Sequence, residues 1–165
     1  DNQYLLSVSR DRSMCLFKKE LEGPDPYRLI HKLEKAHERV IWATSWSPCS
    51  NRFVTASRDK TVKVWKVEGE AFTLDTELPK FSSAATAVDC APQLSEGRPV
   101  LAVGTEEGQI SVWKDKQGYG CTAALRAEES LSGSVSRVHW NPIPGVMQIA
   151  AGGADHSVRV YSLAP

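Results

Sequence analysis

The chain has 165 residues, of which 41% are hydrophobic and 24% are charged, so its composition is that of a globular protein and excludes an intrinsically disordered one. Twenty Lys and Arg residues balance twenty Asp and Glu residues, and this zero net charge excludes a strong long-range attraction to nucleic acid or to a membrane surface. No apolar run approaches the roughly 20 residues of a membrane-spanning helix, and the opening Asp1–Tyr4 lacks the basic and apolar regions of a signal peptide.

Short β-prone segments, separated by polar turns, follow one another along the whole chain. Most of them alternate apolar and polar residues, which is the pattern of a strand with one buried face. The segment 128–131 is long enough for one helical turn, and no other helix is predicted. In chain order, the predicted strands are 4–9, 14–17, 27–33, 39–48, 52–57, 61–65, 72–78, 87–91, 100–104, 110–113, 122–125, 136–140, 148–152 and 158–161.

A phrase that begins with an acidic residue and ends with an aromatic residue recurs four times, and each copy starts 48 residues after the previous one. The copies are Asp11–Phe17, Asp59–Trp65, Glu107–Trp113 and Asp155–Tyr161. A repeat period between about 20 and 50 residues predicts a solenoid, a propeller or an array. Short antiparallel strands within each period favour the blades of a β-propeller, which are stable only when each blade packs against its neighbours.

The second copy and the segment before it resemble the WD40 family of β-propellers. The residues that match the structural tetrad of that family are His37, Ser57, Asp59 and Trp65. In such a tetrad, the Trp indole donates a hydrogen bond to the Ser hydroxyl and the His bridges to the Asp, so a buried polar chain fixes the turn. The other copies match only in part, and none has a histidine before its first strand. Their matching residues are Ser9, Asp11 and Phe17; Thr105, Glu107 and Trp113; and Asp155 and Tyr161, with Gly153 in place of the serine.

The tetrad residues Ser57, His37 and Asp59 are also the residue types of a hydrolase triad. A nucleophilic serine needs an exposed hydroxyl on a strained turn and an oxyanion hole. Ser57 instead lies in a predicted strand, and the sequence contains no Gly-x-Ser-x-Gly motif. We therefore predict no catalytic residue in this chain.

The cysteines and histidines show no spacing that is typical of a metal site. The four cysteines, of which one is Cys49, are far apart in sequence, and two disulfides are arithmetically possible. The other three, Cys15, Cys90 and Cys121, lie in apolar strand-like segments, which favours reduced core thiols. No helix follows the glycines at the strand ends, as a phosphate-binding loop would require. The sequence therefore predicts neither a metal site nor a cofactor.

Four longer segments resemble the family of second subunits of the Elongator complex, and its fungal members in particular. They are Leu5–Arg12, Ala36–Trp42, Thr55–Trp65 and Val158–Ala164, the last of which resembles the C-terminus of that family. The resemblance implies that the chain is the C-terminal half of the second of two seven-bladed WD40 propellers. The expected fold is all-β, with three, four, four and three strands, or about three and a half four-stranded blades. The blades are expected at 1–34 (partial), 37–79, 83–126 and 133–165 (partial).

The same resemblance implies a non-catalytic scaffold. It would support assembly of the Elongator complex and the modification of wobble uridine in transfer RNA by the catalytic subunit. The implied partners are the catalytic and large scaffold subunits, together with the remainder of the propeller itself. Contact with transfer RNA would be indirect or weak, and no membrane partner is expected. The implied location is the cytoplasm, or the nucleus as well.

One rim of a propeller carries exposed turn residues, and such loops commonly present binding groups. Arg and Trp are the residue types enriched at the energetic hot spots of interfaces. We therefore hypothesise a partner-binding rim for another protein, for RNA, or for an acidic or phosphorylated peptide. In the alternative interpretation, the arginines are solvated, or are paired with Glu38 or with the neighbouring turn acids. The residues of the hypothetical rim are Arg10, Arg12, Arg39, Trp42 and Arg58.

Overall fold

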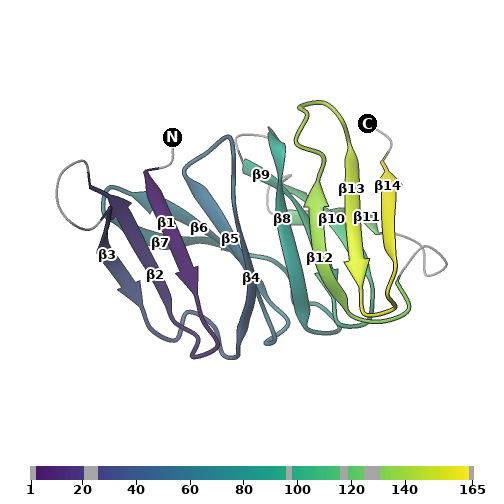
Figure 1. The fold of residues 1–165 in the computed structure, drawn as a ribbon, viewed down its shortest axis with the longest axis horizontal. Helices are drawn as coiled ribbons and strands as arrows, with labels where there is room; N and C mark the ends of the chain where they lie inside the picture. The colour runs from purple at the N-terminus through teal and green to yellow at the C-terminus, as the bar shows by residue number, and fades with distance from the viewer. Residues whose placement is uncertain (1–2, 21–25, 96–97, 116–118, 125–130, 164–165) are drawn as a thin grey trace.

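The computed structural model describes residues 3–20, 26–95, 98–115, 119–124 and 131–163, and within these ranges it contains strands and their connections but no helix. The strands form four antiparallel sheets, which follow one another along the chain (Figure 1). The first and last sheets have three strands each, and the two between them have four. The segment 125–130, which includes most of the predicted helical turn, lies outside the described residues.

Each sheet consists of consecutive strands that pair in the order of the chain. The first contains β1 (Tyr4–Val8), β2 (Met14–Lys19) and β3 (Tyr27–Leu33). The second contains β4 (Ile41–Trp46), β5 (Arg52–Ser57), β6 (Val62–Glu68) and β7 (Ala71–Glu77). The third contains β8 (Ala85–Ser95), β9 (Arg98–Thr105), β10 (Ile110–Asp115) and β11 (Tyr119–Ala124). The fourth contains β12 (Val135–Trp140), β13 (Gln148–Gly153) and β14 (Val158–Ser162). The prediction of an all-β, partial propeller is confirmed.

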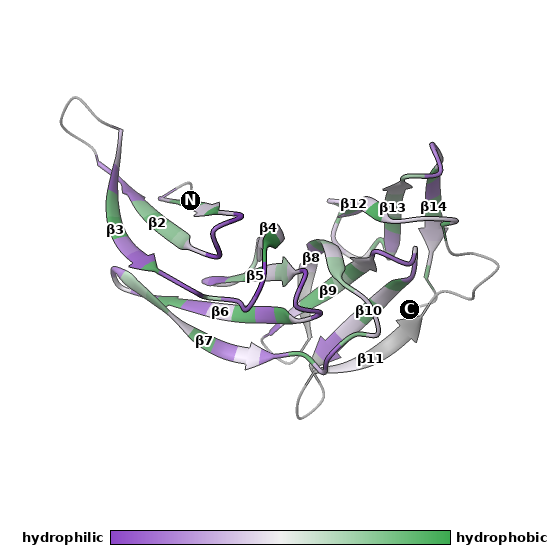
Figure 2. Cartoon of the chain, turned by 90° about the horizontal axis from the view of Figure 1, so that it is seen from below, coloured by the Kyte–Doolittle hydropathy of each residue, from purple (hydrophilic) through white to green (hydrophobic). Residues whose placement is uncertain are grey.

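The four sheets are arranged in an arc, which Figure 2 shows from the side of the β1–β2 and β13–β14 turns. The first strands of the last three sheets, β4, β8 and β12, lie on the concave side of this arc. The last strands of the two complete sheets, β7 and β11, lie on the convex side. Blades that are arranged around a central axis have this order. The concave side is therefore the wall that faces the axis.

The hydrophobic core is divided into three clusters, one between each pair of neighbouring sheets. In the first cluster, Leu16 of β2 and Phe53 of β5 are fully buried. In the second, Val64 of β6 and Leu101 of β9 are fully buried. Burial of a side chain of this size contributes about 2 kcal/mol to stability. Each inner sheet therefore depends on both of its neighbours.

Both faces of the second sheet are covered at β6, so the strand predicted at 61–65 is more buried than its sequence pattern indicates. Period-two alternation predicts one exposed face, on which Lys63 lies. In the structure, the Lys63 side chain is only 16% exposed, because its Nζ donates a hydrogen bond of 2.9 Å to the Ala36 carbonyl and lies 3.6 Å from a Glu77 carboxylate oxygen. The loop before β4 and the outer strand β7 cover this face.

The same two irregularities recur from sheet to sheet. In the first three sheets, the outermost strand and its neighbour share a register shift, which comes directly before the aromatic residue of the repeated phrase, at Phe17, Trp65 and Trp113. A second shift lies at the start of each strand that faces the axis, and it skips one residue. The skipped residues are Trp42, Thr86 and Ser136. A bulge of this kind turns the extra side chain away from the regular alternation.

Several strand boundaries differ from the prediction, and β8 and β11 are two examples. β8 extends over Ala85–Ser95 instead of 87–91, and β11 covers Tyr119–Ala124 instead of 122–125, because both continue to pair with the neighbouring strand beyond their apolar residues.

The cysteines agree only in part with the prediction of reduced core thiols. Cys90 is a buried free thiol, and burial raises the pKa of this thiol. Cys15 is free but only half-buried, so it is not a full core residue as predicted, whereas the side chain of Cys121 lies outside the described residues.

Candidate functional site

The four copies of the repeated phrase form tight turns at one edge of the molecule. We call this edge the turn rim and define it by residues 10–12, 58–60, 106–108 and 154–156. In each turn, the residue after the acid has a positive φ angle, between 60° and 84°. Only glycine adopts this left-handed conformation without strain, so the non-glycine turns need other contacts to hold them. The residues with positive φ are Arg12, Lys60, Gly108 and His156.

The acid of the phrase supplies these contacts in three of the four turns. One carboxylate oxygen accepts a hydrogen bond from the backbone N–H two residues later, at 2.8 Å for Asp11, 3.0 Å for Asp59 and 3.1 Å for Asp155. The short Asp side chain is suited to this local bond. The third turn combines Glu107 with Gly108, whose conformational freedom replaces the bond from an Asp. The acid at the start of the phrase is therefore a turn-forming residue.

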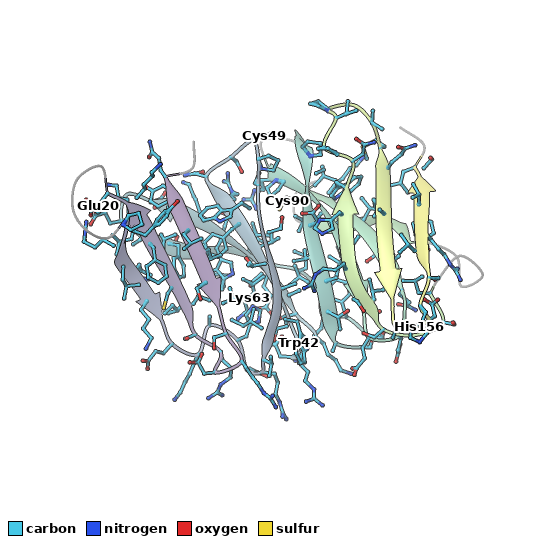
Figure 3. The ribbon with its side chains drawn as sticks, viewed as in Figure 1. Glu20, Trp42, Cys49, Lys63, Cys90 and His156 are labelled. Carbon is cyan, nitrogen blue, oxygen red and sulfur yellow. The ribbon has the colours of Figure 1, made fainter. Side chains whose placement is uncertain are left out.

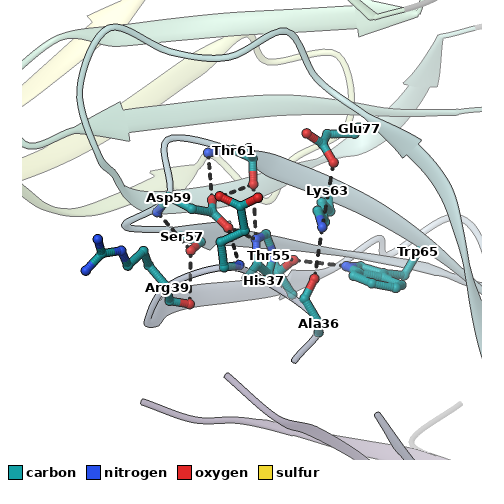
Figure 4. A network of polar contacts seen from close by, with 11 residues as sticks. Ala36, His37, Arg39, Thr55, Ser57, Asp59, Thr61, Lys63, Trp65 and Glu77 are labelled. Atoms are coloured by element: carbon teal, nitrogen blue, oxygen red, sulfur yellow. Dashed lines mark hydrogen bonds and ion pairs between the residues drawn. The ribbon is translucent and has the colours of Figure 1, made fainter. Parts of the chain in front are cut away.

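The second turn carries a buried polar network (Figure 4). The Trp65 indole Nε1 donates a hydrogen bond of 2.9 Å to Thr55 Oγ1, which lies 2.7 Å from His37 Nε2. His37 Nδ1 lies 3.0 Å from Asp59 Oδ2, and the other carboxylate oxygen accepts hydrogen bonds from Thr61 N–H and from its hydroxyl, at 3.0 and 2.6 Å. The side chains of His37 and Asp59 are 0% and 3% exposed. The network therefore joins the loop before β4 to the strands β5 and β6 and to the turn between them.

The hydroxyl between Trp65 and His37 belongs to Thr55, whereas the sequence interpretation assigned that place to Ser57. The hairpin register explains the difference. Thr55 pairs with Lys63 and therefore lies diagonally opposite Trp65, while Ser57 lies at the turn itself. Ser57 Oγ donates a hydrogen bond of 3.3 Å to the Arg39 carbonyl and accepts one of 3.1 Å from Asp59 N–H. Ser57 thus fixes the backbone beside the network.

The residue types fix the direction of two of these hydrogen bonds. The Trp65 indole can only donate, so the Thr55 oxygen accepts there. The Asp59 carboxylate can only accept, so His37 Nδ1 carries a proton and donates to it. Burial alone would raise the pKa of Asp59, but the hydrogen bonds from His37 and Thr61 outweigh burial and hold its pKa well below the ordinary value.

Acidification is therefore expected to weaken the second sheet. A carboxylate whose folded pKa is lowered contributes stability that is complete above the unfolded pKa of about 4 and is lost as the pH falls toward the folded pKa. In the full-length protein, hydrogen exchange corrected for intrinsic rates should show that the free energy of opening of β5 and β6 decreases from about pH 5 to about pH 3. The Asp59→Asn variant removes the titrating group and should flatten this dependence. Equal slopes in the two proteins would contradict the assignment.

The later sheets replace the polar network with apolar contacts. In the fourth, the Leu131 side chain lies 2.7 Å from the position that a Cβ on Gly153 would occupy, so glycine is needed where the second sheet has Ser57. Ser132 N–H donates a hydrogen bond of 3.1 Å to Asp155, as Glu38 N–H does to Asp59. The loop–turn contact is thus retained without a histidine.

In the third sheet, the aromatic residue of the phrase also has a different partner. The Trp113 indole donates a hydrogen bond of 2.9 Å to Ser111 Oγ on its own strand. The Phe81 ring packs against Trp113 with a centroid distance of 5.1 Å. The complete tetrad-type network is therefore a property of the second sheet among the described turns.

The arrangement around Ser57 differs from a hydrolase triad. Both His37 nitrogens are engaged by other side chains, and the Ser57 hydroxyl is fully buried and bonded to backbone. A nucleophile would need that hydroxyl exposed and bonded to the histidine. Within the described ranges, no three His, Cys, Asp or Glu side chains cluster as metal ligands would, and no helix is long and apolar enough to cross a membrane.

The structure places the hypothetical rim residues on or beside the turn rim. Figure 3 shows Trp42 at the same edge as His156, with Cys49 at the opposite edge, and the Trp42 side chain is 48% exposed. Arg10, Arg39 and Arg58 are exposed, and within the described part of the chain none of them forms an ion pair. Pairing with Glu38 or with the turn acids, one form of the alternative interpretation, is therefore not found there, whereas its other form, solvated arginines, is untested.

These residues do not form one continuous site. Trp42 and Arg58 line a hollow of about 350 Å³ beside the axis, which we call the axial hollow. Arg12 instead lines a separate hollow of about 200 Å³ together with Lys32 and Lys35. The axial hollow also contains Arg137 of β12, which the sequence interpretation missed because only the packing of neighbouring sheets brings it close to Trp42 and Arg58.

Comparison with known proteins supports the repeat architecture. The family described as "WD domain, G-beta repeat" matches residues 27–66, which extend from β3 into β6. The chain is 34% identical to Elongator complex protein 2 of Saccharomyces cerevisiae over 172 residues, covering 99% of this chain and 22% of that protein. The corresponding protein of Schizosaccharomyces pombe is 35% identical, with 99% and 22% covered.

The similarity extends beyond fungi. Elongator complex protein 2 of Arabidopsis thaliana is 36% identical over 181 residues, covering 98% of this chain and 22% of that protein. The chain thus spans 22% of the length of these relatives. Taken with the four sheets and their repeated turns, these matches show that residues 27–66 match a WD40 repeat and that the chain is similar along nearly its whole length to one part of Elongator complex protein 2.

Proposed function

We propose that the chain is part of a non-catalytic WD40 scaffold subunit of the Elongator complex. The observation that carries this proposal is the similarity to Elongator complex protein 2 along 99% of the chain. The buried, fully bonded Ser57 supports a scaffold rather than an enzyme. In this role the subunit supports assembly and the modification of wobble uridine in transfer RNA by the catalytic subunit. Its implied location is the cytoplasm, or the nucleus as well.

The remainder of the propeller is one proposed partner. Among the described strands, β1 pairs with β2 alone and β14 with β13 alone, so the first and last sheets each have an edge without a partner strand. Large apolar side chains are exposed on these strands: Leu5 by 49%, Val158 by 77% and Val160 by 67%. Exposed edges of this kind favour pairing with another strand. Further blades of a seven-bladed ring would cover them.

The turn rim is the surface that we propose for the other Elongator subunits, the catalytic and large scaffold subunits among them. Exposed arginines that form no ion pair within the chain can bind a carboxylate of another protein without breaking an existing contact. Trp42 beside them adds a large apolar surface, which is half-exposed. The stable sheets behind the rim fix the positions of these side chains.

Charge reversal on the rim tests this proposal. We expect the Arg10→Glu, Arg58→Glu double variant of the full-length protein to lower co-purification of the Elongator subunits about tenfold, since two partner contacts become repulsive. The matched control is Lys19→Glu, at the end of β2 away from the turn rim, which should leave co-purification unchanged. Unchanged co-purification with the double variant, together with a native far-UV spectrum, would refute the proposed role of the rim.

Direct binding of RNA by the rim is a second candidate, because Arg58 lies with the aromatic Trp42 in one hollow. Contacts to RNA phosphates would make the affinity of the full-length protein fall steeply with salt, as counterions are released. A salt-independent affinity would exclude it. The balanced charge of the chain favours the scaffold role.

A further inference from the structure

Three bulges at equivalent positions present side chains to the same place. Trp42, Thr86 and Ser136 are the residues that the register skips at the start of β4, β8 and β12, and all three line the axial hollow. Bulges next to binding sites re-aim side chains that the regular alternation would point elsewhere. The repetition of the device in three consecutive sheets indicates a built surface instead of an accidental gap.

The axial hollow is lined by more positively charged than negatively charged side chains. Two guanidinium groups, of Arg58 and Arg137, and one carboxylate, of Glu106, line it. Arg58 and Glu106 hold equivalent positions, each directly before the acid of its turn. The Arg137 Nη1 donates to the neighbouring Ser136 carbonyl at 2.9 Å, and neither arginine forms an ion pair with a described residue. The hollow therefore has an excess of one positive charge with unused donors.

The rest of the lining is partly apolar and partly hydroxyl-bearing. The half-exposed Trp42 ring and the buried Val135 form the apolar part. Thr86 Oγ1 donates a hydrogen bond of 2.6 Å to the Val135 carbonyl, which ties the third sheet to the fourth and fixes the floor of the hollow. An exposed Trp beside arginine donors favours a ligand with an apolar group next to an anionic one.

We propose that the axial hollow binds a peptide segment of a partner protein in which an Asp or Glu stands next to a large apolar residue. The carboxylate would accept hydrogen bonds from Arg58 and Arg137, and the apolar side chain would pack on Trp42. Glu106 sets the selectivity, since it repels additional negative charge and limits the site to sparsely acidic segments. This inference deepens the proposed scaffold function and rests on it.

The test uses opposite charge changes in the same hollow. Full-length protein would be applied to an array of overlapping synthetic peptides that tile the chains with which it co-purifies. We expect Arg137→Glu to weaken binding of peptides with an acidic residue beside an apolar one by about tenfold. Glu106→Gln should strengthen the same binding by about threefold. The control Lys35→Glu lies on the other, 200 Å³ hollow and should change neither.

Each alternative ligand gives a different result. A preference for basic peptides, with the two charge effects reversed, would overturn the inference, and so would binding that Arg137→Glu leaves unchanged. Binding of RNA oligonucleotides alone would also overturn it, in favour of a nucleic-acid site. If subunit assembly depends on Arg10 and Arg58 while peptide binding ignores Arg137 and Glu106, the scaffold proposal stands and only this inference fails. An unchanged far-UV spectrum of each variant excludes misfolding as the cause.

Discussion

Replacement of Asp59 with Ala is expected to lower the free energy of opening of the second sheet by about 4 kcal/mol. Asp59 accepts hydrogen bonds from the His37 imidazole, from Glu38 N–H, and from both the N–H and the hydroxyl of Thr61. Alanine accepts none of them, and His37, whose side chain is 0% exposed, would keep a buried donor without its carboxylate. Because this network joins the loop before β4 to the β5–β6 hairpin, its loss affects the whole sheet.

The matched control is Asp11→Ala, which alters the same position of the same turn in the first sheet. Asp11 accepts a local bond of 2.8 Å from Ser13 N–H, but it is exposed and no histidine reaches it among the described residues. We expect a much smaller loss there. Native-state hydrogen exchange of the amides of β2 and of β6, in the full-length protein, measures both effects separately. Similar losses in the two sheets would show that the buried network adds nothing to the local turn bond.

The architecture was accessible from the sequence because each repeat contains its own strand and turn information. The acid of the phrase forms the turn in the first, second and fourth copies, and alternating apolar residues on either side form the hairpin. These effects are local, so a fixed interval of 48 residues predicts equivalent hairpins in all four sheets. The extent to which side chains are buried was harder to predict, as Lys63 illustrates, because it depends on contacts with loops and strands that are distant in the sequence.

The network and the axial hollow needed long-range information. The choice between Thr55 and Ser57 depends on which residue lies diagonally opposite Trp65, and this follows only from the hairpin register. The grouping of Trp42 with Arg137 depends on bulges and on the packing of β4, β8 and β12 side by side. Neither residue type nor spacing in the chain indicates these bulges. The turns that the repeated phrase forms were therefore predictable, whereas contacts that depend on strand register or on packing between sheets were not.

Replacement of Gly108 with Ala is expected to destabilise the third and fourth sheets by about 3 kcal/mol. Gly108 has a φ angle of 84°, and a Cβ at this position would lie 1.9 Å from the Leu131 carbonyl oxygen and 2.7 Å from that of Gly133. The backbone of the loop before β12 would have to move, which would lengthen the 3.2 Å hydrogen bond from Leu131 N–H to the Gly108 carbonyl. Since Leu131 is buried in the cluster between these two sheets, the displacement would also disturb their shared core.

Gly69→Ala separates the two causes of this loss. Gly69 also has a positive φ angle, of 62°, but no atom lies within 4 Å of the position of its Cβ. Only the conformational strain applies there, and the expected loss is about 1 kcal/mol. Hydrogen exchange of β10 and β12 in Gly108→Ala, and of β6 and β7 in Gly69→Ala, gives the two values in the full-length protein. Equal losses would mean that the loop before β12 yields without cost to the clash with a Cβ at position 108.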